Sequence, residues 1–189
     1  MKLFPLLAGL LVIILSSCTL ITSTNVPGTT VGKTPKTLLG KYELQYPSEF
    51  AALMEGGSDT KTYVTLASDR MTVSSADGDN VSMLGDSLFF STIKKQTYLS
   101  MGAPPSLIVF KVVKSGKNIN LYPMFANESA NTASLSPYFS QVTEVPGEPG
   151  EDGEPGASTF EVRIDDSKLE NFFKSEQAMK DPFVLKKVK

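Results

Sequence analysis

The sequence predicts a mainly β fold, an antiparallel meander that forms a barrel or a sandwich and carries one or two short helices. The first observation is that Tyr42, Leu44 and Tyr46 alternate with charged or polar residues over residues 40–46, the period of a strand with one buried face. The second is that turn-forming segments separate apolar segments at intervals of about ten residues. Strands at this spacing, joined by short turns, are typical of sandwiches and barrels.

The remaining strands follow from the same pattern. Residues 62–66 and 70–73 flank the sequence Ala67-Ser68-Asp69 and are expected to form a hairpin. Asp77-Gly78-Asp79-Asn80 is a second turn sequence. Further strands are expected at residues 87–93, 96–101, 107–113, 118–125 and 183–188. The segment 107–113 is apolar enough to lie in the centre of the sheet.

Two segments have helical rather than strand spacing. Residues 48–55 place Phe50, Leu53 and Met54 between a serine cap and a pair of glycines. Near the C-terminus, residues 167–170 have the Ser-x-x-Glu pattern of a capping box, and Leu169, Phe172 and Phe173 form one apolar stripe. We expect this second helix to cover an end or a face of the sheet, with its stripe in the core rather than in a partner site.

The N-terminus has the organisation of a secretory signal. Lys2 is followed by an apolar run over residues 3–15, which is shorter than the ~20 residues of a permanent membrane span. The run ends at Leu15-Ser16-Ser17-Cys18, and Cys18 is the only cysteine in the chain. An ordinary signal peptide followed by a chance cysteine, or a small buried cysteine, is the alternative interpretation.

The motif Leu15-Ser16-Ser17-Cys18 resembles the lipobox of bacterial lipoproteins. The resemblance implies cleavage before Cys18, a diacylglycerol thioether on its sulfur and further acylation of its new amine. Two or three acyl chains, each contributing about 0.8 kcal/mol per buried methylene, anchor a protein stably in a membrane. Because Thr19 rather than Asp follows Cys18, the resemblance also implies the outer membrane if the host is Gram-negative.

These observations divide the chain into three parts. Residues 1–17 are expected to be a lipoprotein signal peptide. Residues 18–37, which contain the lipidated Cys18 and many threonines, are expected to be a flexible tether. Residues 38–189 are expected to form one β-rich domain with a single core.

Composition excludes several kinds of chemistry. The chain has no His and a single Cys, which excludes a His general base, disulfides and Cys/His zinc sites. Removing residues 1–17 removes only Lys2 of the charged residues and leaves 17 basic against 20 acidic side chains, a formal net charge of −3. Such an acidic chain lacks the strongly basic surface that is typical of nucleic-acid-binding proteins. We expect no cofactor and no enzymatic activity.

An acidic loop with many Gly and Pro residues is expected at residues 144–157. It contains Glu144, Glu148, Glu151, Asp152 and Glu154 without a basic residue. Hard cations favour clustered carboxylates, but the ordered spacing of known calcium loops is missing. We therefore expect a mobile solvated hairpin loop and no metal site.

Two short patterns are typical of penicillin-recognising enzymes but lie in the wrong context. Residues 91–94 fit Ser-x-x-Lys, and residues 114–116 read Lys-Ser-Gly. The serine of such enzymes begins a helix, whereas Ser91 lies in a predicted strand and Lys114 opens a predicted turn. Acyl-transfer catalysis is therefore not expected.

Three functions remain for comparison. The leading hypothesis is a non-enzymatic envelope lipoprotein, held in the membrane by its acyl chains, that contacts another envelope component. The arrangement of predicted strands resembles the small lipocalin-like barrels of envelope lipoproteins, which implies a second hypothesis, a binder of a small apolar ligand. Its candidate ligand-facing residues are Tyr42, Tyr46, Phe89 and Phe110. A His-free hydrolase that uses carboxylates or a Ser–Lys pair is the third.

Overall fold

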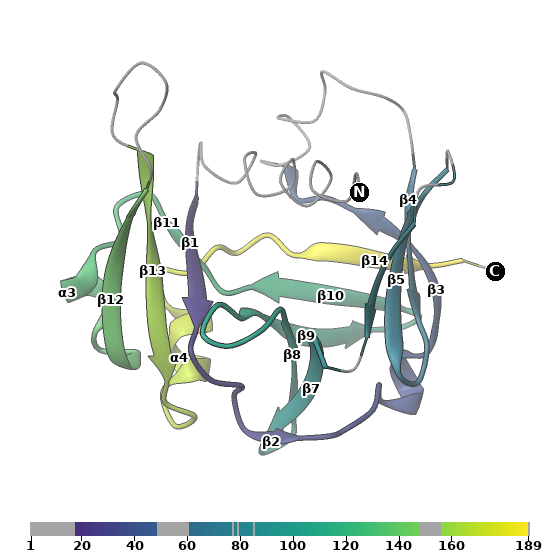
Figure 1. Ribbon diagram of the computed structural model, residues 1–189, viewed down its shortest axis with the longest axis horizontal. Helices are drawn as coiled ribbons and strands as arrows, with labels where there is room; N and C mark the ends of the chain where they lie inside the picture. The colour runs from purple at the N-terminus through teal and green to yellow at the C-terminus, as the bar shows by residue number, and fades with distance from the viewer. Residues whose placement is uncertain are drawn as a thin grey trace.

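The structure is a computed structural model that describes residues 18–48, 61–76, 78, 80–84, 86–147 and 156–188. It confirms a mainly β fold with short helices, in which an antiparallel sheet curls into a half-barrel. Within the described residues, a ten-stranded sheet makes the half-barrel and a four-stranded sheet stands beside it (Figure 1).

The large sheet contains the strands that the sequence predicts, except that the strand expected over residues 118–125 ends at Pro123 and Phe125 begins a strand of the small sheet. Its neighbouring strands all pair antiparallel. Their spatial order is β2 (Thr29–Thr30), β7 (Leu88–Ile93), β8 (Gln96–Met101), β9 (Ile108–Ser115), β10 (Asn118–Pro123), β14 (Phe183–Lys187), β3 (Gly40–Gln45), β4 (Thr62–Leu66), β5 (Arg70–Ser75) and β6 (Asn80–Leu84). As expected, the apolar strand β9 lies inside the sheet, with Val109 fully buried.

The small sheet consists of strands that the sequence did not predict as such. Its order is β11 (Phe125–Asn127), β1 (Cys18–Ser23), β13 (Gly156–Ile164) and β12 (Phe139–Gly147). β1 pairs antiparallel with β11 but parallel with β13. Three short helices complete the described structure, the 3-10 helix η2 (Lys36–Leu38), α3 (Thr132–Leu135) and α4 (Leu169–Lys174).

The expected flexible tether over residues 18–37 is wrong. β1 lies between two partner strands, and its side chains Leu20 and Ile21 are 7% and 0% exposed. Leu20 packs with Phe125 and Met179, whereas Ile21 joins the core between the sheets. β2 and η2 occupy the rest of the segment. The physical reason is that Thr and Ile favour strands, so this threonine-rich segment finds partners in the sheet.

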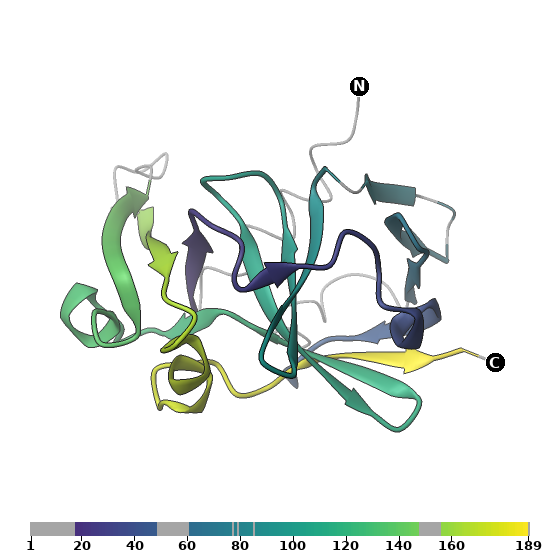
Figure 2. The ribbon, with the colours of Figure 1, turned by 90° about the horizontal axis from the view of Figure 1, so that it is seen from below.

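Two large hydrophobic cores and the small cluster of Leu20, Phe125 and Met179 hold the molecule together. One fills the half-barrel and includes Tyr42, Phe90, Leu99 and Leu185, each at most 3% exposed. The other joins the small sheet, α4 and the outer face of β7 to β9, and it includes Ile21, Tyr98 and Phe172. Figure 2 shows α4 packed beneath β13 and beside the crossing strands of the large sheet.

Helix α4 confirms the predicted apolar stripe but not the predicted cap. Leu169 and Phe172 are fully buried. The residue that caps the helix is Lys168, whose side chain makes no capping hydrogen bond. Instead, Asp165 Oδ1 accepts hydrogen bonds from the Ser167 backbone N–H at 3.0 Å and hydroxyl at 2.6 Å. The predicted capping box is therefore wrong, because Ser167 forms a local turn with the Asp165 side chain instead of capping the helix.

The other predicted irregular segments are described only in part. Apart from Ser48, the helix expected over residues 48–55 lies outside the described residues. The acidic loop expected over residues 144–157 is shorter than predicted, because Glu144 to Gly147 belong to β12 and Gly156 and Ala157 to β13. Residues 148–155 lie outside the described part.

Candidate functional site

Cys18, the predicted lipidation site, is the first residue of β1. It pairs with Asn127 of β11, and Asn127 is held by hydrogen bonds of 2.9 Å to the Glu176 carbonyl and from the Ser129 hydroxyl. Because β1 runs parallel with β13, Cys18 lies at the end of the small sheet where β12 and β13 are connected (Figure 1). A group attached to Cys18 is thus joined directly to the sheet.

The four candidate ligand-facing aromatics do not surround one cavity in the described structure. Tyr42 and Phe110 belong to the core of the half-barrel, with Phe110 edge-on to Phe183 at 6.2 Å between ring centroids. Tyr46 packs on the small cluster of Leu20, Phe125 and Met179, and Phe89 packs on the core between the sheets. β7 places Phe90, not Phe89, inside the half-barrel, because successive strand residues face opposite sides.

Tyr42 is fixed by three polar contacts rather than aimed into an open space. Its hydroxyl donates to the Leu38 carbonyl at 2.9 Å. The Lys187 ammonium lies 4.6 Å from the centre of the ring and donates to the Tyr42 hydroxyl at 3.4 Å. The same ammonium donates to the Leu39 carbonyl at 2.7 Å. These contacts tie η2 and the end of β14 to β3, which is a structural role.

A pocket of about 260 Å³ opens between η2 and the ends of β8 and β9. Its walls combine Pro35, Thr37 and Leu38 of the η2 segment with Lys95 of the β7–β8 turn, Gln96 and Thr97 of β8, and Val112, Val113 and Lys114 of β9. The Gln96 side-chain amide donates to the carbonyls of Thr97 at 2.9 Å and Val112 at 2.7 Å, which fixes this wall. Sequence reasoning did not single out this place, since Lys95 and Thr37 belong to no motif.

A second group of titratable side chains joins α4 to the sheet. Lys111 Nζ lies 2.7 Å from Glu170 Oε1, and the Tyr98 hydroxyl donates to Glu170 Oε2 at 3.3 Å. Burial, and then the negative charge of Glu170, raises the pKa of Tyr98 well above its ordinary value. The sequence signal for this group was weak, because Tyr98, Lys111 and Glu170 are far apart in the chain.

The group around Glu170 resembles a structural ion pair more than a reactive centre. Lys111 also lies 5.8 Å from the centre of the Phe173 ring, and Tyr98 is 1% exposed. No hydrogen bond links Ser91 or Ser100 to this group, and both hydroxyls are buried without a partner among the described residues. The arrangement orients α4 and offers no exposed nucleophile.

The Ser-x-x-Lys pattern does not form a reactive pair. Ser91 is fully buried in β7, whereas Lys94 is exposed in the turn that follows. Residues three apart in a strand face opposite sides, so the two side chains diverge. Lys114 lies at the end of β9.

The described residues contain neither a metal-binding cluster nor a membrane-spanning helix. No three His, Cys, Asp or Glu side chains there are placed to share a metal ion. In the same part of the chain, every helix is too short or too polar to cross a bilayer.

Comparison with known proteins adds no relative. No protein-family model, curated protein or solved structure matches the chain. Function therefore has to be argued from the residues themselves.

Proposed function

We propose that this chain is a lipid-anchored, non-enzymatic protein of a bacterial cell envelope. The observation that carries the proposal is the sequence Leu15-Ser16-Ser17-Cys18 directly behind an apolar run of signal-peptide length. In a Gram-negative host, Thr19 rather than Asp after Cys18 favours localisation of the lipoprotein in the outer membrane. Acyl chains on Cys18 are the membrane contact, and another envelope component is the expected partner.

The position of Cys18 in the fold supports this role. Cys18 opens β1 at an end of the small sheet, not in the middle of a buried strand. Two or three acyl chains attached there would hold the sheet directly at the lipid surface with no spacer. Such a short attachment gives the domain a defined orientation, which favours contact with a partner at a fixed height above the membrane.

The filled interior gives less support to the alternative, the binding of a small apolar ligand. Tyr42, Leu99, Ile119 and Leu185 pack against one another inside the half-barrel and are at most 2% exposed. The pocket at its mouth has lysine, threonine and glutamine beside Pro, Leu and Val in its walls, whereas sites for apolar ligands are lined predominantly by hydrophobic side chains. A hydrolase is supported less still, because the titratable group around Glu170 packs between α4 and the sheet.

Metabolic labelling with a clickable palmitate analogue tests the proposal. The native chain, expressed in a bacterial host, should take the label, fractionate with membranes and lose residues 1–17. Cys18→Ala should take no label and remain uncleaved, while Ser16→Ala, which keeps a small residue in the motif, should behave like the native chain. Label that persists in Cys18→Ala would exclude Cys18 as the site of lipid attachment.

A further inference from the structure

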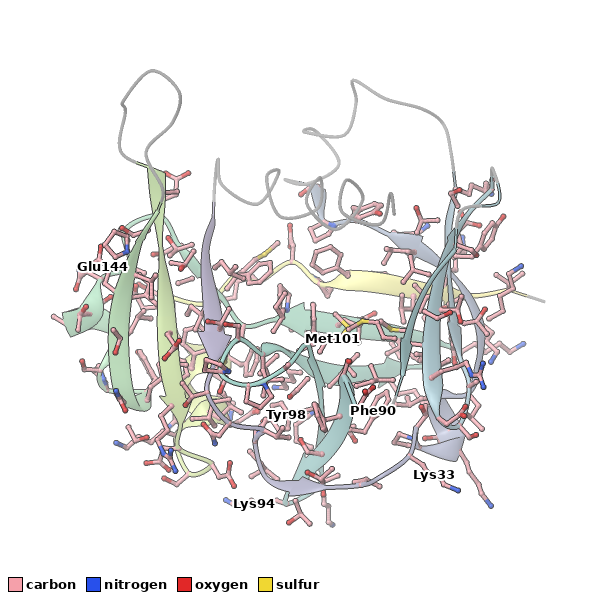
Figure 3. All side chains as sticks on the ribbon, in the orientation of Figure 1. Lys33, Phe90, Lys94, Tyr98, Met101 and Glu144 are labelled. Carbon is pink, nitrogen blue, oxygen red and sulfur yellow. The ribbon has the colours of Figure 1, made fainter. Side chains whose placement is uncertain are left out.

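We propose that the pocket between η2 and the ends of β8 and β9 binds the phosphate group of a small molecule through Lys95 and Lys114. This site is independent of the lipid anchor. In Figure 3, Lys33 and Lys94, which flank the pocket walls in sequence, lie at the opposite end of the molecule from the start of β1.

The two lysines reach the pocket from neighbouring parts of the sheet. Thr97 pairs with Val112 in the β8–β9 ladder; Lys114 follows Val112 by two residues in β9, and Lys95 lies in the turn just before β8. Leu99, Phe110 and Val112 face the core of the half-barrel. Because side chains alternate along a strand, Lys114 belongs to that same inner face, at its rim. The pocket residues confirm that both reach one space.

Two ammonium groups at one pocket are unfavourable unless an anion compensates them. Like charges that share one small opening repel each other. Neither lysine has a carboxylate within ion-pair distance in the described structure, whereas Lys61, Lys111, Lys168 and Lys174 each have one. No acidic residue lines the pocket. Two exposed ammonium groups without a counter-charge thus share one small opening.

The surroundings strengthen the positive charge and supply hydrogen-bond donors. Lys36 and Lys94 are exposed and directly follow or precede pocket residues in the chain, and neither has a carboxylate partner among the described residues. Thr37 and Thr97 line the pocket, and their hydroxyls make no hydrogen bond to a described residue. Hydroxyl groups and ammonium groups together are a typical donor set for phosphate oxygens.

Size and charge indicate a phosphate monoester rather than a larger ligand. The volume of about 260 Å³ lies just below the range of pockets that hold drug-sized ligands, about 300–1,000 Å³. A phosphate monoester carries up to two negative charges near pH 7, which matches two lysines. The Gln96 amide is already engaged with two carbonyls, so recognition rests on the lysines and the threonine hydroxyls.

Titration of the folded domain at constant ionic strength tests the site. Inorganic phosphate and glycerol 3-phosphate are the two probes, and binding is followed by calorimetry and by amide NMR shifts. The site variant is Lys95→Gln with Lys114→Gln. The matched control is Lys94→Gln with Lys117→Gln, which removes the same charge from two exposed turn residues outside the pocket walls.

We expect saturable binding that shifts the amides of Gln96 and Thr97, reduced about tenfold or more in the site variant because two charge-assisted hydrogen bonds are lost. The control should change affinity by no more than about threefold, since its charges are exposed and screened. Tighter binding of glycerol 3-phosphate identifies a phosphorylated small molecule, and equal binding identifies free phosphate. Thermal melts in chloride should show that the site variant is folded and no less stable.

Two results would overturn the proposal. The first is the absence of saturable binding of either probe to the native domain. The second is an equal loss of affinity in the site and control variants, which would show that only the general surface potential attracts the anion.

Discussion

At the residue scale, Gly28 has the backbone conformation and the surroundings that demand glycine. Its φ is +64°, and a side chain there would collide with the Thr92 carbonyl and the Ile93 side chain of β7. Gly116 has nearly the same φ, +61°, but has open space around it. The pair therefore separates backbone strain, which both positions share, from close packing, which only Gly28 has.

We expect Gly28→Ala to destabilise the protein clearly more than Gly116→Ala. The left-handed conformation costs a residue with a side chain about 1–2 kcal/mol at either site, and Gly28→Ala adds the displacement of β2 from β7. It also threatens the hydrogen bond of 2.9 Å from the Gly28 N–H to Asp166. Urea denaturation of both variants measures the difference, and equal losses would contradict the close contact between β2 and β7.

The raised pKa of Tyr98 predicts that the protein loses stability in alkali. Its pKa is raised in the folded state, so above about pH 10 the unfolded chain releases this proton while the folded chain keeps it. Stability should therefore fall as pH rises through that range, by up to about 1.4 kcal/mol per pH unit for this one group. Tyr98→Phe should be less stable at pH 7 but flatter in alkali.

The control for this experiment is Tyr122→Phe, at a half-buried tyrosine of β10. Its stability should keep the native alkaline slope. Native and Tyr98→Phe proteins that lose stability in parallel above pH 10 would show that Tyr98 ionises normally.

Residue patterns predicted the strand faces well wherever alternation was clear. Tyr42 is buried as the alternation in β3 predicted. The pattern was ambiguous where two aromatics are adjacent, and Phe89 and Phe90 consequently exchanged their expected sides. Lys95 could not be recognised as a pocket residue from the sequence. The residues that share the pocket with it, such as Lys114 and those of η2, lie elsewhere in the chain.

At the element scale, β1 shows why composition alone misled. A segment rich in Thr, Gly and Pro is typical of a linker, but Leu20 and Ile21 point to opposite sides of a strand and each enters a different core. The partners of β1 lie more than a hundred residues away, in β11 and β13. A local pattern cannot show such a pairing.

A chain that begins at Thr24 is therefore expected to lose its cooperative thermal transition. Removing β1 leaves β11 without its strand partner and β13 paired with β12 alone. It also exposes Phe125, Phe160 and Val162, which are at most 2% exposed in the native fold. A chain that begins at Thr19 keeps β1 except Cys18 and should melt near the native temperature. Identical melting curves for both chains, followed by circular dichroism, would restore the interpretation of this segment as a tether.

The strands β12 and β13 were missed for a different reason. Ser140, Gln141, Thr143 and Glu144 are exposed on the edge strand β12, and Pro146 and Gly147 follow at its end. An edge strand with many polar residues and a terminal Pro has little apolar periodicity to detect. Because the sequence after β12 is acidic and rich in Gly, the predicted loop extended into the end of β12 and the start of β13.

At the scale of the whole molecule, the predicted anchor lies in the small sheet and the pocket lies beside the large sheet. The sequence predicted the meander of the large sheet, because its hairpins are local. It did not predict the second sheet, which unites β1, β11, β12 and β13 from distant parts of the chain. As a result, the predicted anchor at Cys18 joins folded structure directly, and the pocket of Lys95 and Lys114 lies away from it.

The central proposal is that the mature chain begins at an acylated Cys18 that is also the first residue of β1. The most direct measurement is the intact mass of the full chain, extracted in detergent from a bacterial envelope, with fragmentation of its N-terminus. We expect the mass of residues 18–189 plus a diacylglycerol group, with or without an added amide-linked acyl chain, and all of the extra mass on Cys18. A mature chain that begins elsewhere, or that carries an unmodified Cys18, would contradict the proposal.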